Sequence, residues 1–143
     1  MSVSKLPGFH LVSENSRLSF MLDIVGSSFI FVENDIFKKA RNLVAGYDGG
    51  QWDFVKSDSS SFGYIRPTEK RIWKVNTSFH SVSMSSDALG LALTVMACNH
   101  ALFAVCVSGS TNESHQTLSN TYDALMDLWP EHPEVDSIAQ FLD

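Results

Sequence analysis

The last 69 residues of this 143-residue sequence contain no Lys or Arg. All ten Lys and Arg lie within residues 1–74, where eight acids leave a balance of +2, and residues 75–143 hold the other eight acids, a balance of −8. The net charge of −6 argues against a general nucleic-acid binder, which needs a basic face. The asymmetry has two readings: ordinary sampling around a long buried helix, or an acidic face that avoids nucleic acid or meets a basic protein partner.

The acids are too few to imitate DNA. Duplex DNA carries one negative charge per about 1.7 Å of axis. A compact chain of this length spans roughly 40 Å, so imitating that much duplex needs on the order of 24 phosphate-like charges. The eight acids of the second half fall well short of that number.

Cysteine is scarce as well. Cys98 and Cys106 fall in one predicted helix, eight residues apart. That separation is about 12 Å, too far for a disulfide, so we expect two free, buried thiols, as in a reducing cytosol. Residues 1–9 lack the apolar run of a signal peptide, and we expect a cytoplasmic protein.

Signatures of catalysis are missing too. The sequence has no phosphate-binding loop, dinucleotide motif, nucleophile elbow or zinc-protease motif, and no two of its five histidines have ligand spacing. We therefore expect no catalytic residue, no metal and no cofactor. His100, within an apolar helix, is expected to be a hydrogen-bonded core histidine rather than a ligand. Asp48, Asp53 and Asp58 resemble a solvated edge more than an acid/base pair.

The composition is that of a single globular domain covering residues 1–143, with 44% apolar and 18% charged residues. A first helix is predicted over residues 35–45, with Asn34 as its N-cap and Gly46 ending it. Two apolar segments before it, residues 17–20 and 29–32, are predicted as short strands.

From Gln51 the apolar period changes to two. Trp52 and Phe54 begin the alternation, which continues in three later segments separated by short polar loops, one of them the serine-rich residues 57–61. This pattern predicts an antiparallel meander of about four strands. The predicted strands cover residues 52–55, 62–65, 72–75 and 79–84.

A long helix follows the meander. Ser85 or Ser86 can cap it, Asp87 suits its first turn, and residues 88–107 contain no charge. The stretch is long enough to span a bilayer, but it has no flanking Lys, Arg, Trp or Tyr. A helix that is apolar on nearly all sides is typical of the centre of a globular core, so we expect no membrane span.

Two further helices complete the chain. The first is predicted over residues 115–128, before Pro130, and the second opens with His132-Pro133-Glu134. The fold class is therefore α+β: an antiparallel meander packed against a long central apolar helix and flanking helices, in one domain. The residues expected to face inward are Leu118, Tyr122, Leu125, Met126 and Trp129, then Val135, Ile138, Ala139 and Leu142.

The most individual segment is residues 47–54, Tyr-Asp-Gly-Gly-Gln-Trp-Asp-Phe. Asp-Gly-Gly is a turn that admits positive φ and leads into an aromatic strand. We favour a structural connection with Trp52 in the core. The functional alternative is a loop that presents Tyr47 and Asp48 to a partner. A second candidate surface is the acidic cluster of Asp123, Asp127 and Glu131.

These segments together resemble the ArdB/KlcA antirestriction family. Residues 47–54 are similar to the family's Y-x-G-G-Y-W-[EH]-F, with Gln51 in place of an aromatic residue. Residues 84–90, Met-Ser-Ser-Asp-Ala-Leu-Gly, resemble its M-S-A-D-A-A-G, and residues 62–67 and 132–138 resemble its second strand and last helix. The matching positions are structural motif residues, and the most specific are Gly49, Gly50, Trp52, Phe54 and Asp87.

The resemblance implies a protein of plasmids or other mobile elements that relieves type I restriction of unmodified incoming DNA, and not by DNA mimicry. It implies a protein partner, either the type I restriction enzyme or host DNA-processing machinery, reached directly or indirectly. The charge count independently predicts no useful affinity for duplex DNA. The alternative is a related interaction module of a mobile element without antirestriction activity.

Overall fold

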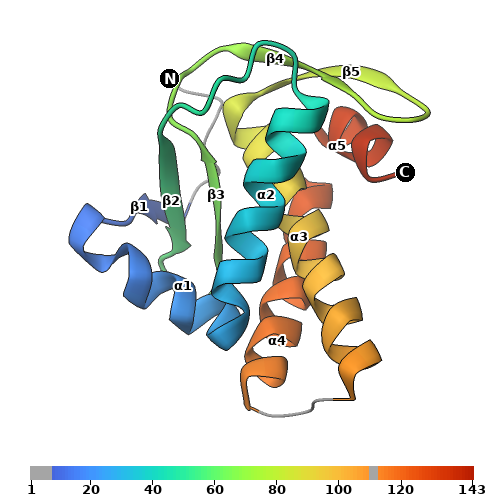
Figure 1. Cartoon of the computed structure of the whole chain (residues 1–143). Coiled ribbons are helices and arrows are strands. Elements are labelled where there is room, and N and C mark those ends of the chain that lie inside the picture. The colour runs from blue at the N-terminus through green and yellow to red at the C-terminus, as the bar shows by residue number, and fades with distance from the viewer. Residues whose placement is uncertain (1–7, 110–112) are drawn as a thin grey trace.

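A computed structural model describes residues 8–109 and 113–143 and has an α+β architecture (Figure 1). Five strands lie at the upper left and top of the view, and long helices run beside and below them. The strands are β1 Phe9–Leu11, β2 Trp52–Ser57, β3 Gly63–Pro67, β4 Ile72–Asn76 and β5 Ser81–Ser85. The α-helices are α1 Arg17–Val25, α2 Phe29–Leu43, α3 Ser86–Ser108, α4 Glu113–Leu128 and α5 Val135–Leu142, with short 3-10 turns at Glu14–Ser16, Gly26–Ser28 and Trp129–Glu131.

The four strands predicted by the alternation are present, but they do not form one meander. β2 and β3 pair antiparallel, and β1 pairs with the other edge of β2. β4 and β5 form a separate antiparallel hairpin. β4 does not pair with the remaining edge of β3, where the Ile65 N–H of β3 donates instead to the Thr94 hydroxyl of α3 at 3.2 Å. β4 meets the segment after α2 through a bridge between Val44 and Val75.

The two short strands predicted upstream are wrong. Residues 17–20 begin α1 and residues 29–32 begin α2. In α1 the buried residues Phe20, Met21, Ile24 and Val25 follow helical spacing, which a reading of the first four residues alone cannot detect. Asn34 consequently lies inside α2 rather than capping it, and α2 ends at Leu43, before Gly46.

The long apolar helix α3 occupies the centre of the molecule, as predicted (Figure 1). The Ser85 hydroxyl caps it by accepting a hydrogen bond from the Ala88 N–H at 3.2 Å. Gly90 allows α3 to lie directly on β3, because a side chain there would collide with the Ile65 carbonyl and the Arg66 backbone. By length and composition α3 could cross a membrane, yet half of its most apolar window is buried inside the protein.

The last two turns of α3 extend beyond the packed core. Phe103 and Val107 are 71% and 72% exposed. Cys106 lies in the same turns and is exposed, so the expectation of two buried thiols is wrong for this residue. Cys98 is free and buried as predicted, and burial raises the pKa of its thiol to about 12. Its thiolate, the reactive form, is therefore strongly disfavoured.

The inner faces of α4 and α5 differ from the prediction by a few residues. Leu118, Leu125 and Ile138 are buried, but Met126 and Ala139 are exposed. Their places in the core are taken by Thr121, whose hydroxyl donates to the Ile24 carbonyl, and by Phe141. The buried face of α4 is therefore rotated toward α1, which Thr121 contacts at Ile24. The buried face of α5 includes Phe141 in place of Ala139.

The position of α3 makes a first prediction. Leu93 is fully buried, so Leu93→Ala should lower the free energy of unfolding by roughly 2–5 kcal/mol through lost packing. Phe103→Ala, a truncation in the exposed part of the same helix, should change it by less than about 0.5 kcal/mol. Denaturant unfolding followed by circular dichroism measures both, and equal losses would contradict the core position of Leu93.

Candidate functional site

The buried carboxylate of Asp87 joins three separate segments of the chain. Asp87 lies in the first turn of α3 and has no exposed surface. One of its oxygens, Oδ1, accepts hydrogen bonds from the Tyr64 hydroxyl at 2.8 Å and from Arg66 Nη1 at 2.6 Å. The other, Oδ2, lies 2.9 Å from Nε2 of the equally buried His132. The carboxylate therefore connects α3, β3 and the segment before α5.

The hydrogen bonds of His132 define its protonation. The Glu134 backbone N–H donates to Nδ1 of His132 at 2.9 Å, so Nδ1 carries no proton. Nε2 must then be the protonated nitrogen that donates to Asp87. His132 is thus a neutral imidazole with both nitrogens used, and the negative charge of Asp87 is balanced by Arg66.

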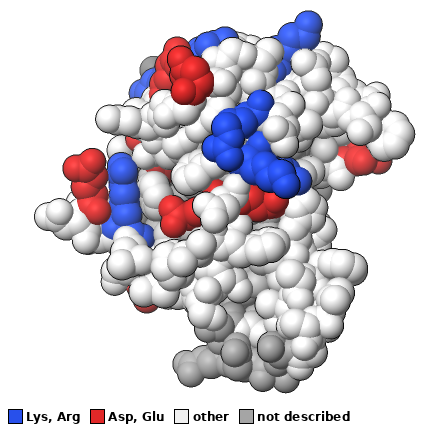
Figure 2. All heavy atoms as spheres, in the orientation of Figure 1, with Lys and Arg blue, Asp and Glu red and all other residues white. Residues whose placement is uncertain are grey.

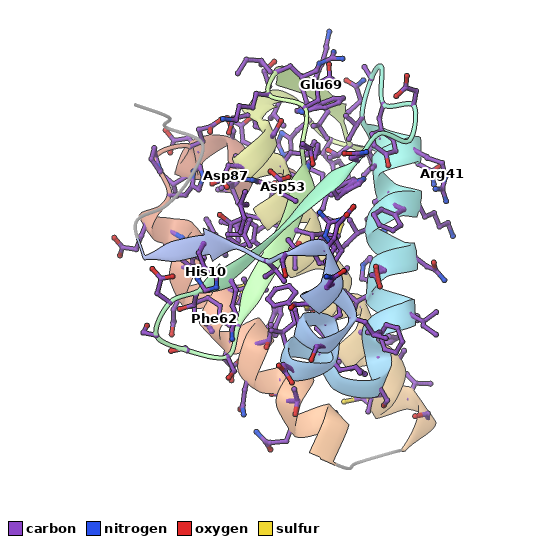
Figure 3. The ribbon with its side chains drawn as sticks, turned by 90° about the vertical axis from the view of Figure 1, so that its left-hand side faces the viewer. His10, Arg41, Asp53, Phe62, Glu69 and Asp87 are labelled. Carbon is purple, nitrogen blue, oxygen red and sulfur yellow. The ribbon has the colours of Figure 1, made fainter. Side chains whose placement is uncertain are left out.

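Arg66 extends the cluster to β2. Asp53 and Arg66 are directly opposite in the β2–β3 register, and Arg66 Nε lies 3.4 Å from Asp53 Oδ2. Figure 3 shows Asp53 and Asp87 near one another, carried by β2 and α3. Burial, reinforced by the negative charge of Asp87 and the hydrogen bond to it, raises the pKa of the Tyr64 hydroxyl far above its usual range. Tyr64 is therefore fixed as a donor.

A second carboxylate supports the same helix start. Glu134 Oε1 accepts from the Ser85 N–H at 2.8 Å, and Glu134 Oε2 accepts from the Ser85 hydroxyl at 2.5 Å. Nearby, Trp73 Nε1 donates to the Ser86 hydroxyl at 2.8 Å, and Ser86 in turn donates to the Glu69 carbonyl. Negative side chains at the N-terminus of a helix are favoured by its dipole, so Asp87 and Glu134 also stabilise α3.

The Asp87 cluster is a structural site rather than a reactive one. Each of its polar groups has a partner, and Asp87 and His132 are shielded from solvent. Asp87→Ala would leave the Arg66 charge without its closest partner, so we expect a loss of about 3–5 kcal/mol in the free energy of unfolding. Asp123→Ala, an exposed acid on α4, is the control and should cost less than about 0.5 kcal/mol. A loss below about 1 kcal/mol for Asp87→Ala would show that the network contributes little.

The Asp-Gly-Gly turn comes shortly before β2, the strand that carries Asp53. Tyr47 is half-buried, its hydroxyl accepts from Trp52 Nε1 at 3.0 Å, and its ring packs edge-on against Trp52 at 5.9 Å between centroids. Trp52 is in the core, as the structural reading predicted. Asp48 and both turn glycines are exposed. Tyr47 therefore anchors the turn, and Asp48 is the side chain that it displays.

The other predicted surface is elsewhere. Asp123, Asp127 and Glu131 are all exposed and follow one another at intervals of four along α4 and the turn after it. The turn at residues 47–50 lies elsewhere in the fold, between α2 and β2. The two candidate surfaces are thus separate.

No cluster of three or more potential metal ligands occurs among residues 8–109 and 113–143. A cleft of about 460 Å³ lies between α3, α4 and α5 and is lined mainly by apolar side chains, with His100 among the residues that line it. His100 Nδ1 is 3.0 Å from Asp35 Oδ2, so this histidine is hydrogen-bonded as predicted. Its side chain is 41% exposed, however, so the prediction of a core position is wrong.

Comparisons with known proteins identify the family of this chain. A family model described as antirestriction protein matches residues 45–143. The putative antirestriction protein YubI of Escherichia coli K12 is 31% identical over 136 residues, which cover 92% of this chain and 93% of YubI. The chain belongs to the antirestriction protein family. A solved structure of the KlcA and ArdB proteins, 22% identical, has the same fold over the full length of both chains, with a TM-score of 0.79.

The segments that carry the resemblance to ArdB/KlcA antirestriction proteins meet at the Asp87 cluster. Residues 62–67 supply Tyr64 and Arg66, residues 84–90 supply Asp87, and residues 132–138 supply His132. Asp53 comes from the fourth segment, residues 47–54. Arg66 and His132 were not predicted as partners of Asp87. The available signal was a charged residue within the buried, apolar strand β3, which requires a buried counter-charge.

The turn makes a stability prediction. Gly49 has a φ of +92°, which strains any side chain, whereas Gly50 has no positive φ and no atom within 4 Å of an added Cβ. Gly49→Val should therefore lower the free energy of unfolding by about 1–2 kcal/mol or more. Gly50→Val, the neighbouring control, should stay within about 0.5 kcal/mol of the parent. Equal effects at both positions would contradict a conformational role for Gly49.

Proposed function

We propose that this protein relieves restriction of unmodified incoming DNA by type I restriction-modification systems, acting in the cytoplasm through a protein partner. Membership of the antirestriction family carries the proposal. The structurally similar KlcA and ArdB proteins have antirestriction activity against type I systems in vivo but not in vitro. That difference favours a mechanism that requires a cellular component besides the purified restriction enzyme.

DNA mimicry is disfavoured because some of the acidic side chains are engaged in contacts within the protein. A mimic must display negative charges to solvent at the spacing of phosphates. Of the eight acids in residues 75–143, Asp87 is buried against Arg66 and Glu134 is hydrogen-bonded to Ser85. The remaining acids cannot form the array of on the order of 24 charges that a duplex of this size carries.

The arrangement supports binding rather than catalysis as the mode of action. The polar groups of the Asp87 cluster are hydrogen-bonded to one another, and the described part of the chain contains no group of three or more potential metal ligands. The two proposed classes of partner are the type I restriction enzyme and host DNA-processing machinery, reached directly or indirectly. No cofactor enters this proposal.

Tyr47 and Asp48 are the residues that we propose for partner contact, with Asp123, Asp127 and Glu131 as the second choice. The turn places Asp48 in solvent on a support of packed aromatic rings, where Tyr47 contacts Trp52 and Trp73. A rigid support lowers the entropy cost of binding through an exposed loop.

Plating efficiency of unmodified phage on a type I restricting host tests the function. Expression of the protein should raise plating on the restricting host and leave it unchanged on an isogenic non-restricting host. A folded protein that gives no increase would support the alternative, an interaction module of a mobile element that has no antirestriction activity.

The same assay tests the turn. Asp48→Ala should lower restriction relief while the melting temperature stays within a few degrees of the parent, because Asp48 is exposed and lies outside the core. Asp136→Ala, which removes an exposed acid from α5, is the matched control and should retain full relief. If Asp48→Ala also retains full relief, the turn is only a connector, and the Asp123, Asp127 and Glu131 surface becomes the better candidate.

A further inference from the structure

The fold gathers half of the chain's basic residues at one end. Residues 44–47 run beside β4, where the Ala45 N–H donates to the Lys74 carbonyl at 2.9 Å and Val44 bridges Val75. Gly46 lies against the Arg71 guanidinium, which a side chain at position 46 would approach to 3.4 Å. The end of α2 and the start of the hairpin are thus adjacent. We call this surface the basic end, and it comprises Lys38, Arg41, Lys70, Arg71 and Lys74.

The basic end is available for binding. All five side chains are exposed, and within residues 8–109 and 113–143 none of them makes an ion pair within 4.0 Å. By contrast, Lys39 is 3.8 Å from Asp35, and Arg66 is paired with Asp53 and Asp87. Figure 2 shows Lys and Arg side chains over the upper part of α2 and at the top of the molecule.

Two features make this surface more than a solvated charge cluster. The Arg71 guanidinium stacks over the Trp73 ring, 4.3 Å from its centroid, which restrains its position before any partner arrives. Ile72, between Arg71 and Trp73, is 65% exposed on the outer face of β4. Arg71 stacks on Trp73 whereas Ile72 faces outward, so the two side chains are separate contact points on this surface, and arginine is a residue type enriched in protein interfaces.

The charges at this end favour a protein over DNA. Two exposed acids belong to the same end: Glu69 directly precedes Lys70, and Asp48 directly follows Tyr47, whose ring lies 6.4 Å from that of Trp73. Figure 3 shows Glu69 and Arg41 at this end of the molecule. Duplex DNA presents negative charge alone, so these two acids would face phosphates with no compensating cation. An acidic protein surface can place a cation opposite each of them.

We propose that the basic end is the docking surface for an acidic protein partner. The Asp-Gly-Gly turn follows residues 44–47 at the same end of the molecule. The docking role therefore rests on the proposed function, and it extends that function by stating the charge of the partner. The Lys and Arg side chains contribute charge complementarity and orientation at close range, and Ile72 adds exposed apolar area on the outer face of β4.

Binding of a labelled oligoglutamate peptide to the intact protein at low salt tests the charge preference directly. Two double variants remove two charges each from different elements of the basic end, Lys38→Gln with Arg41→Gln and Lys70→Gln with Lys74→Gln. The control double variant, Lys39→Gln with Lys56→Gln, makes the same change in net charge outside it. Each basic-end variant should raise the Kd about fivefold to tenfold, and the control about twofold or less.

Four results would overturn the proposal. The first is no binding of oligoglutamate by the parent protein, and the second is equal weakening by the control variant. The third is tighter binding of a labelled DNA duplex with the same dependence on the basic end, which would make the ligand a nucleic acid. The fourth is self-association in light scattering that both basic-end variants abolish, which would make the occupant a second copy.

The phage assay separates this inference from the proposed function. If the parent relieves restriction, both basic-end variants should lose relief while the control variant retains it. Full relief by folded basic-end variants would overturn the docking role in restriction relief. If the parent itself gives no relief, the proposed function fails, and the peptide and duplex measurements still decide what the basic end binds.

Discussion

Asp87 carries a negative charge at a position with no exposed surface, so the groups around it must stabilise that charge. An unpaired buried ion costs several kcal/mol, so its partners must be held accurately. They come from Tyr64 and Arg66 on β3 and from His132 before α5, while Arg66 also reaches Asp53 on β2. A carboxylate in the first turn of α3 thus aligns the sheet, the central helix and the C-terminal segment, which are far apart in the sequence.

The contacts around the start of α3 also hold the elements that carry the exposed turn and the basic end. The hydrogen bonds of Ser85, Ser86 and Trp73 fix the beginning of α3 against the β4–β5 hairpin. The hairpin in turn holds the end of α2 through Val44 and Ala45. The turn at residues 47–50 and the basic end are therefore mounted on rigid elements, even though their side chains face solvent. Such an arrangement suits binding, because little order has to be acquired on contact.

The sequence was informative where the signal was local. Alternation of apolar residues located β2 to β5, and the uncharged run located α3. It failed for the starts of α1 and α2, where four apolar residues fit a strand or a helix equally well. It also did not separate the two sheets, because the contacts of β3 with α3 and of β4 with Val44 join segments distant in the sequence. The Asp87 partners lie 21 to 45 residues away, a separation at which periodicity carries no information.

The charge asymmetry also acquires a different meaning in three dimensions. In the sequence, residues 75–143 form an acidic half and residues 1–74 a nearly neutral one. In the fold, Asp87 is neutralised by Arg66 from the first half, and Glu134 is held by Ser85, so part of the acidic excess is internal. Meanwhile Lys38 and Arg41, some thirty residues from Lys70 and Lys74, share one end of the molecule. The fold thus places a local basic end on a protein of negative net charge. An acidic partner would be repelled by that net charge at long range, so selective binding at the basic end requires close approach.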